Sequence, residues 1–197
     1  MRITLHEYDL AWPQRFAAFG ADLRRSLLDR VPDRLVAIHH IGSTSVPGLA
    51  AKDLIDIQVT LQPVDVRNPL EPFEPVCEAI EVLGYRWQRG NPDLRKRFFH
   101  LDAEPGPDGT AGRRLVNLHV RPHGEFTAQA SLLLRDVLRS SPEARDRYET
   151  TKRELAAREW ATVDDYADAK GDTIWALLRD ADGWAADTGW CPDPSDA

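Results

Sequence analysis

The segment from Ile38 to Val59 constrains the fold of this chain more than any other. An apolar run that ends at Ile41 is typical of a short strand. The next residues, Gly42 to Gly48, are rich in Gly and Ser and predict a tight loop with exposed N–H groups and hydroxyls. A second apolar, β-branched run from Leu54 to Val59 predicts another strand, with the carboxylate of Asp56 inside it.

A strand, a Gly-Ser loop and a second strand that carries an aspartate are the parts of a phosphate and metal site. Loop N–H groups and the hydroxyls of Ser43 and Thr44 can hold phosphate oxygens. The carboxylate of Asp56 can hold Mg²⁺, which prefers hard oxygen ligands and leaves other positions to water and phosphate. The alternative is a hairpin-like turn whose hydroxyls cap a helix. These residues alone leave both interpretations open.

The longer string around this loop resembles the signature of a known family. The string from His40 to Leu49, followed by Lys52 and by Asp56 between two isoleucines, is similar to the signature of the GrpB family. Tyr166 with Lys170 also resembles the helical half of that family, so the similarity covers nearly the whole chain. The GrpB family is assigned to the nucleotidyltransferase fold of polymerase β-like enzymes. The resemblance therefore implies that fold.

Hydrophobic periodicity divides the chain into a mixed first part and a helical second part. Apolar spacing predicts helices and strands before residue 122 and three helices after it. The fold class is α+β: a small mixed β-sheet flanked by helices, nucleotidyltransferase-like by resemblance, with a C-terminal helical region. Without an internal repeat or a clear linker, we expect one GrpB-like domain over 1–197. It comprises a core at 1–122, a helical part at 123–180 and a loosely packed tail at 181–197.

Further candidate site residues lie on the strands and helices that follow. Arg97 ends a short basic run, and an arginine fork matches phosphate oxygens, although a solvated loop is the alternative. Asn117 and His119 share one face of a predicted strand and can point to a cleft. Lys170 lies within an apolar helical stripe, so its charge must reach solvent or an anion such as phosphate. Arg135 belongs to the stretch that resembles the family's helical half.

The predicted site therefore combines three groups of residues. The expected catalytic residues are Asp56 and His119, with Asp56 as the metal ligand. The expected phosphate or nucleotide ligands are His40, Gly42, Ser43, Thr44, Lys52, Arg97 and Lys170. The expected lining residues of the cleft are Gln58, Asn117 and Arg135.

The chain departs from the usual metal pattern of the fold at one position. Enzymes of this fold usually carry two carboxylates one residue apart on a strand, but Gln58 stands where the second would follow Asp56. Asp53 is three residues from Asp56, so a regular strand turns it to the opposite face. We therefore expect one Mg²⁺ and leave a second one open. Arg97, His40, His119 and Lys170 could alternatively neutralise charge without a tightly held metal.

Composition limits the partners of such a site. A net charge of −7 argues against an extended nucleic-acid partner, which needs a basic footprint. Two distant cysteines, Cys77 and Cys191, are too few for a disulfide framework and suit the cytoplasm. The first residues lack the apolar core of a signal peptide, and no apolar run is long enough to span a membrane.

Three functions remain open on the sequence. The first is a Mg²⁺-dependent nucleotidyltransferase that moves a nucleoside monophosphate from an NTP, with ATP expected as donor, to a small-molecule acceptor. The second is a non-catalytic nucleotide- or CoA-binding accessory module, because GrpB-like domains also occur fused to dephospho-CoA kinases. The third is an ATP-dependent ligase that acts through an acyl-adenylate.

Overall fold

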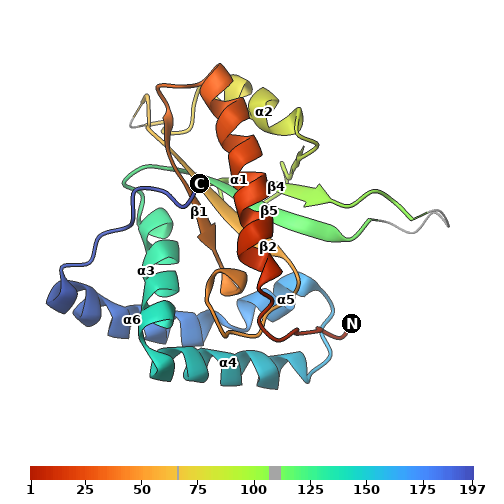
Figure 1. Ribbon diagram of the computed structural model, residues 1–197, viewed down its shortest axis with the longest axis vertical. Coiled ribbons are helices and arrows are strands. Elements are labelled where there is room, and N and C mark those ends of the chain that lie inside the picture. Colours follow the sequence, from red (N-terminus) through yellow and green to blue (C-terminus); the bar gives the residue numbers. More distant parts are fainter. Residues whose placement is uncertain (66, 107–111) are drawn as a thin grey trace.

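The computed structural model describes residues 1–65, 67–106 and 112–197. Its centre is a five-stranded mixed sheet in the order β1-β2-β5-β4-β3, in which β2 and β5 are parallel and the other neighbours are antiparallel (Figure 1). The strands are β1 (Leu35–Ile41), β2 (Ile55–Leu61), β3 (Arg86–Trp87), β4 (Arg97–Asp102) and β5 (Arg114–Pro122). The helices are α1 (Ala11–Arg30), η1 (Ser43–Ser45, a 3₁₀ turn), α2 (Glu74–Glu81), α3 (Phe126–Ser140), α4 (Pro142–Ala156), α5 (Val163–Asp168) and α6 (Gly171–Thr188). The predicted mixed sheet with flanking helices is confirmed.

One face of the sheet carries the main core and is covered by α1 and α2. Successive side chains of β2 and of β5 point to opposite faces of the sheet, so every second one points to these helices. The residues that meet there are buried and apolar, and they include Trp12, Phe16, Leu23, Ile57 and Leu118. Each such side chain stabilises the fold by about 1.5–3 kcal/mol when it leaves water. This face is therefore closed, and any site must lie on the other one.

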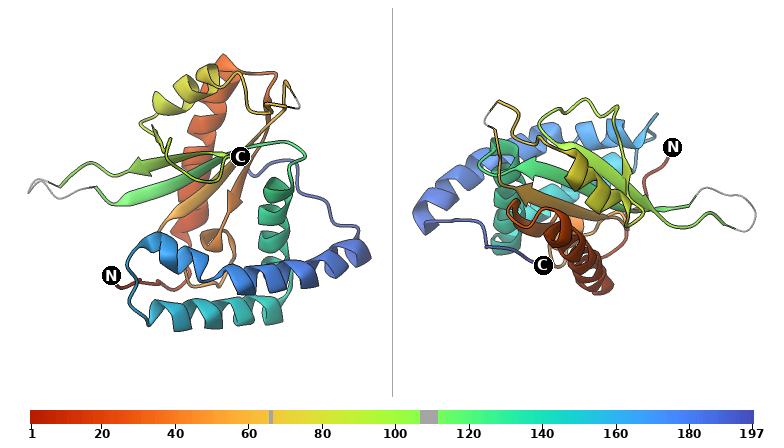
Figure 2. Two further views of the ribbon diagram at one scale, coloured as in Figure 1. Left: turned by 180° about the vertical axis from the view of Figure 1, so that it is seen from behind. Right: turned by 90° about the horizontal axis from the view of Figure 1, so that it is seen from above.

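The opposite face is flanked by the helical second half, α3 to α6 (Figure 2). The helices begin where the local sequence dictates. The side chain of Ser141 accepts a hydrogen bond from the N–H of Ala144 at 3.2 Å and caps α4. Thr162 and Asp165 form a capping box at the start of α5. A second apolar cluster, which includes Tyr148 and Leu177, joins these helices to the loop after β1. No helix in the described ranges combines the length and apolar character needed to cross a bilayer.

The end of the chain is more ordered than its composition suggests. Helix α6 continues to Thr188, and the last residues then run beside β1. Asp196 N–H donates to the carbonyl oxygen of Ile38 at 2.9 Å, and Ser195 Oγ accepts from the N–H of Ile38 at 3.0 Å. The expectation of a loosely packed tail at 181–197 is thus corrected. The free edge of β1 offers unpaired backbone groups, and this segment satisfies some of them.

Candidate functional site

The loop between β1 and β2 turns sharply at Gly42. This glycine has φ 70°, in the left-handed region, and a Cβ there would collide with the carboxylate of Asp56. Ser45 Oγ donates to the carbonyl oxygen of Gly42 at 2.6 Å and holds the turn closed. Glycine at position 42 therefore lets the loop backbone lie directly against the aspartate of the next strand.

Asp56 is held between the loop and the neighbouring strand β5. Asn117 Nδ2 donates to Asp56 Oδ1 at 2.9 Å, and His119 Nε2 lies 3.9 Å from the same oxygen. Burial alone would raise the pKa of Asp56. The contacts with His119 and Asn117 and the charge of Lys52 outweigh burial and hold the pKa below its usual range. Asp56 is therefore a carboxylate at neutral pH, and its side chain keeps 27% exposure.

His119 bridges Asp56 to a lysine. Lys96 Nζ lies 3.3 Å from His119 Nδ1, and an ammonium group can only donate. Nδ1 is therefore the ring nitrogen without a proton, and Nε2–H faces Asp56. Burial lowers the pKa of His119, so the ring is neutral at pH 7. Lys96 also lies 4.7 Å from the ring centre of Phe98, in a cation–π contact.

Three more lysines approach from the helical side. Lys152 comes from α4, Lys170 precedes α6 and Lys52 follows the Gly-Ser loop. Lys152 Nζ donates to the carbonyl oxygen of Ala50. Lys52 and Lys170 lie 5.7 and 4.9 Å from the ring centre of Tyr166. The loop and the helical half therefore bring three lysine side chains to one place.

Burial disfavours the charged forms of these lysines, and the charge of Lys170 adds to this effect at Lys52 and Lys152. Burial, and then the charge of Lys170, lowers the pKa of Lys152 to about 7. Burial and Lys170 also lower the pKa of Lys52, and burial lowers that of Lys170 against the attraction of Asp56. Like charges in a desolvated place favour the neutral amines, and a bound anion would reverse this preference. The three lysines thus form a candidate anion site.

These groups line one cleft of about 690 Å³ between the sheet and helices α4 and α5. Seven of the residues expected from the sequence lie in its wall: Ser43, Thr44, Lys52, Asp56, Asn117, His119 and Lys170. The wall also contains residues that sequence reasoning missed: Lys96, Phe98, His100, Arg114, Lys152 and Tyr166. Gly42 supports the wall from behind, against Asp56.

One signal in the sequence could have identified the missed lysines. The chain has four lysines, and the other 21 of its 25 basic residues are arginines. All four lysines, Lys52, Lys96, Lys152 and Lys170, line this one cleft. Lysine differs from arginine in that its compact charge loses a proton readily when buried. In this arginine-rich chain, the rare lysines mark the site.

The expectation for Arg97 is corrected. Arg97 pairs with Glu71 at 3.1 Å and lies over the ring of Phe73, on the side of the sheet that α2 covers. Strand alternation explains the difference, because Arg97 shares a face with Phe99. Lys96, one position earlier, shares the cleft face with Phe98. The basic run therefore does supply a cation to the cleft, and that cation is Lys96 in place of Arg97.

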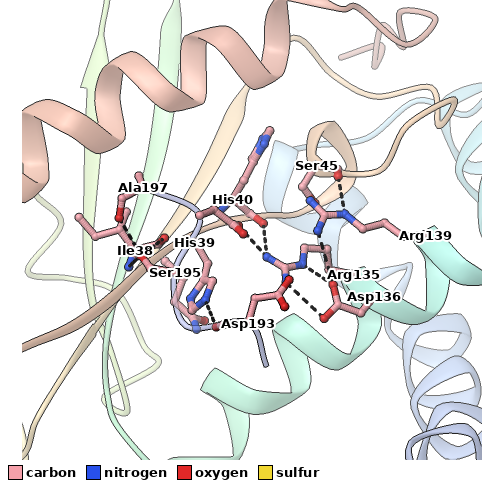
Figure 3. A network of polar contacts seen from close by, with 12 residues as sticks. Ile38, His39, His40, Ser45, Arg135, Asp136, Arg139, Asp193, Ser195 and Ala197 are labelled. Atoms are coloured by element: carbon pink, nitrogen blue, oxygen red, sulfur yellow. Dashed lines mark hydrogen bonds and ion pairs between the residues drawn. The ribbon is translucent and has the colours of Figure 1, made fainter. Parts of the chain in front are cut away.

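Gln58 and Arg135 are also corrected, since neither lines the cleft. Gln58 is fully buried, and its Nε2 donates to the carbonyl oxygen of Ala128 at 3.2 Å because α3 covers this part of the sheet. Arg135 is buried in a polar network (Figure 3). It pairs with Asp136 at 2.6 Å and with Asp196 at 2.7 Å. Both residues are structural at these positions.

His40 supports the loop and does not face the cleft. Its ring stacks on Phe16 at 4.7 Å, and its Nε2 bonds to Thr44 Oγ1 at 3.0 Å. Burial lowers the pKa of His40 to about 4, so it carries no charge near pH 7. The expectation that His40 binds phosphate is therefore replaced by a role in holding Thr44.

The residues around Asp56 fit one Mg²⁺ and not a two-metal centre. Among the residues that the structure describes, no group of three His, Cys, Asp or Glu could hold a metal ion. Asp56 supplies one carboxylate, and the neighbouring Asn117 Oδ1 is an oxygen without a hydrogen-bond partner in the described ranges. Mg²⁺ commonly binds through one or two carboxylates and completes its shell with water and substrate phosphates.

Comparisons with known proteins agree with this fold. Residues 2–180 match the family described as GrpB protein. The UPF0157 protein BH1888 of Halalkalibacterium halodurans is 34% identical over 179 residues, which span 91% of this chain and 82% of that protein. The dephospho-CoA kinase of Mycolicibacterium paratuberculosis is 32% identical over 92% of this chain and 54% of the kinase. This chain thus matches about half of that enzyme.

Solved structures show the same relationship in three dimensions. GrpB from Enterococcus faecalis has a TM-score of 0.68 at 26% identity, over 90% of this chain and 96% of that chain. The Cid1 poly(U) polymerase, in a structure with MgGTP bound, has a TM-score of 0.51 at 15% identity, over 78% of this chain and 45% of that chain. The expected nucleotidyltransferase-like fold is thereby confirmed.

Proposed function

The chain belongs to the GrpB family, and we propose that it is a nucleotidyltransferase that moves a nucleoside monophosphate from an NTP to a small-molecule acceptor. The observation that carries this proposal is the convergence of all four lysines on the cleft that contains Asp56. The wall also carries the aspartates Asp56, Asp93, Asp164 and Asp168, so the cleft offers amines for a polyphosphate beside carboxylates. The aspartate beside the Gly-Ser loop suits the metal that accompanies the polyphosphate.

The triphosphate would lie between the loop and the helical side. Ser43 would offer its hydroxyl, and both Ser43 and Thr44 would offer their N–H groups. The Thr44 hydroxyl is already bonded to His40 and to the carbonyl oxygen of Leu54. Lys52, Lys152 and Lys170 would neutralise the phosphate oxygens and so favour departure of pyrophosphate. An anion there would also relieve the repulsion that lowers the pKa of these amines.

Asp56 and His119 would serve the reacting centre. Asp56, with Asn117 beside it, would hold Mg²⁺, which neutralises charge on the phosphates when bound. An acceptor hydroxyl would form a new bond to the α-phosphorus while the bond from that phosphorus to the α–β bridging oxygen breaks. The hydroxyl proton would pass to His119 Nδ1, the nitrogen without a proton. ATP is the expected donor, and free cysteines and an NTP substrate both suit the cytoplasm.

The first test is a thermal-shift series with ATP, CTP, GTP and UTP, each with and without Mg²⁺. A donor at a hundred times its dissociation constant should stabilise the protein by about 2.7 kcal/mol. We expect a Mg²⁺-dependent shift that Asp56→Asn abolishes. The matched control is Asp53→Asn, because Asp53 is bonded to Trp12 and Arg113 outside the cleft. An Asp56→Asn protein with the full Mg²⁺-dependent response would refute the metal assignment.

A second candidate is a nucleotide- or CoA-binding accessory module without transfer chemistry. Two observations favour it: the burial of Gln58 at the second carboxylate position, and the match to half of a dephospho-CoA kinase. CoA added to the same series distinguishes the two. A shift with CoA alone, or with nucleotides regardless of Mg²⁺, would support the accessory module.

A further inference from the structure

The four lysines of the cleft form two groups by their contacts: Lys52 and Lys170 lie over the ring of Tyr166, and Lys96 lies over Phe98 and against His119. Lys52, Lys152 and Lys170 influence one another's charge and come from the loop and helices. Lys96 stands on the strand side, where its charged neighbours are Arg121, Asp93, Asp56 and Arg95. The negative charge of Asp56 acts on both groups, because it raises the pKa of Lys96 and that of Lys170 against the effect of burial. A polyphosphate held by Lys52, Lys152 and Lys170 would leave Lys96 available for a different ligand.

The charge of Lys96 is poorly compensated within the protein. Its side chain is 13% exposed and lies 3.9 Å from one oxygen of Asp93. The same carboxylate serves Arg95 at 2.9 Å and Arg121 at 3.9 Å. One aspartate is thus shared among three cations, and burial together with Arg121 lowers the pKa of Lys96. A cation that is nearly buried and incompletely paired calls for an anionic partner.

We propose that the acceptor is a small anion, a molecule with a phosphate or carboxylate group that pairs with Lys96 and a hydroxyl or amine that meets His119. The inference rests on the proposed transfer activity and deepens it by assigning the chemical class of the acceptor. Phe98, whose ring centre lies 4.8 Å from that of His119, forms the apolar wall beside this position.

The geometry also links acceptor binding to the exposure of His119. In the free protein Lys96 Nζ donates a hydrogen bond to Nδ1, the unprotonated nitrogen of His119. When Lys96 turns to an acceptor anion, Nδ1 is released as a hydrogen-bond acceptor for the hydroxyl or amine of the same molecule. A neutral acceptor offers Lys96 no such exchange, so the site discriminates by charge as well as by shape.

Lysine NMR tests this assignment directly, because every lysine of the chain lies in the cleft. The full-length protein is labelled with [ε-¹³C]lysine, and its four signals are assigned with single Lys→Arg variants. Saturating α,β-methylene-ATP with Mg²⁺ should shift the signals of Lys52, Lys152 and Lys170. Then sn-glycerol 3-phosphate, glycerate and glycerol are titrated as probes. Either anion should shift the Lys96 signal saturably, and glycerol should leave it unchanged.

Two variants make the test specific. Lys96→Gln should weaken binding of the better anion by about tenfold or more, as expected for loss of one charge-assisted contact. Lys96→Arg should restore much of it. Arg89→Gln is the matched control, since Arg89 is exposed, lies outside the cleft wall and, unlike Arg95, does not share Asp93 with Lys96. Binding that is unchanged in Lys96→Gln, or equal for glycerol, would overturn the proposal.

The same series separates this inference from the proposed function. If the nucleotide analogue shifts no lysine while an anion still binds through Lys96, the transferase proposal fails and the anion site stands. If the nucleotide binds and neither anion shifts Lys96, the acceptor assignment fails alone. An anion that shifts only Lys52, Lys152 and Lys170, and competes with the nucleotide, binds on the polyphosphate side and also overturns the assignment.

Discussion

At the scale of single residues, the choice of lysine over arginine distinguishes the cleft from the rest of the described chain. Arginines form most ion pairs outside the cleft, such as Arg97 with Glu71 and Arg135 with Asp196. Their charge is permanent and their fork is rigid, which suits structural pairing. The lysine amines in the cleft can gain a proton when an anion binds. Lys152 is the clearest case, because its pKa is lowered to about 7.

Lys152 makes the stability of the free protein depend on pH. Its pKa falls from 10.5 to about 7 on folding, because of burial and Lys170. Between these values the unfolded chain binds a proton that the native protein lacks, so this contribution to the free energy of unfolding rises with pH. Below pH 7 both states are charged. Relative to wild type, Lys152→Gln should lose stability between pH 7 and 9, by up to about 1.4 kcal/mol per pH unit.

Urea unfolding of both proteins at pH 6, 7, 8 and 9 measures this effect. A constant difference across the series would show that Lys152 is charged in the native state throughout. The opposite trend is expected for ligand affinity, because a phosphate favours the charged amine. Nucleotide binding should therefore weaken more steeply above pH 7 in wild type than in Lys152→Gln.

At the scale of elements, the strand and loop geometry decides which side chains reach the cleft. Alternation along β4 turns Arg97 to α2 and leaves Lys96 for the cleft. Along β2, Asp56 and Gln58 point to the same side of the sheet, but α3 covers Gln58. Side-chain alternation thus holds along both β4 and β2. On β2, helix α3 keeps Gln58 out of the cleft although its side chain points to the cleft side of the sheet.

The turn at Gly42 gives a prediction at this scale. Gly42→Ala would place a methyl group against Asp56 and impose a strained φ, at a cost of about 1–3 kcal/mol. It should also abolish the Mg²⁺-dependent nucleotide shift. Gly48→Ala is the matched control, because Gly48 has φ 78° but a methyl group there would meet no atom of the described residues within 4 Å. It should cost only about 1 kcal/mol and keep the shift.

Thermal-shift and urea measurements on the two glycine variants decide the matter. Equal nucleotide responses in Gly42→Ala and wild type would show that the position of the loop against Asp56 is unimportant. Loss of the response in both variants would instead show a general requirement for loop flexibility.

At the scale of the whole molecule, the end of the chain is joined to the loop by one polar network. Asp196 pairs with Arg135. Figure 3 shows Arg135 beside Asp136, with which it also pairs. Arg139 Nη1 lies 3.6 Å from Asp136, and its Nε donates to the carbonyl oxygen of Ser45 at 2.9 Å. The C-terminal segment therefore helps to fix both the edge strand β1 and the residues that follow it.

Asp196→Ala should test this arrangement. Loss of its carboxylate removes one partner of the buried Arg135 and the acceptor of His40 N–H, at a cost of about 2 kcal/mol in the free energy of unfolding. Asp187→Ala, in the exposed last turn of α6, is the control and should change stability by less than about 0.5 kcal/mol. Indistinguishable urea curves for wild type and Asp196→Ala would show that the segment contributes nothing to stability.

Features that depend only on neighbouring residues along the chain can be predicted from the sequence. Strand alternation, helical spacing and the turn residues at Gly42 and Ser43 gave the α+β fold, the loop and the position of Asp56 between loop and strand. Helix caps such as Ser141 are equally local, because a cap bonds only to the next few residues. These features were confirmed because the physical interactions behind them are short in sequence.

Contacts between residues that are far apart in the sequence depend on the tertiary structure. No local pattern places Lys152 beside Lys170, or Lys96 beside His119, since those pairs depend on how helices and strands pack. The burial of Gln58, His40 and Arg135 could not be predicted from the sequence either. Helix α3 covers Gln58, Phe16 stacks on His40, and Asp196 forms an ion pair with Arg135. The cost of leaving a polar group buried without a partner is set by the assembled surroundings, and those exist only in the folded chain.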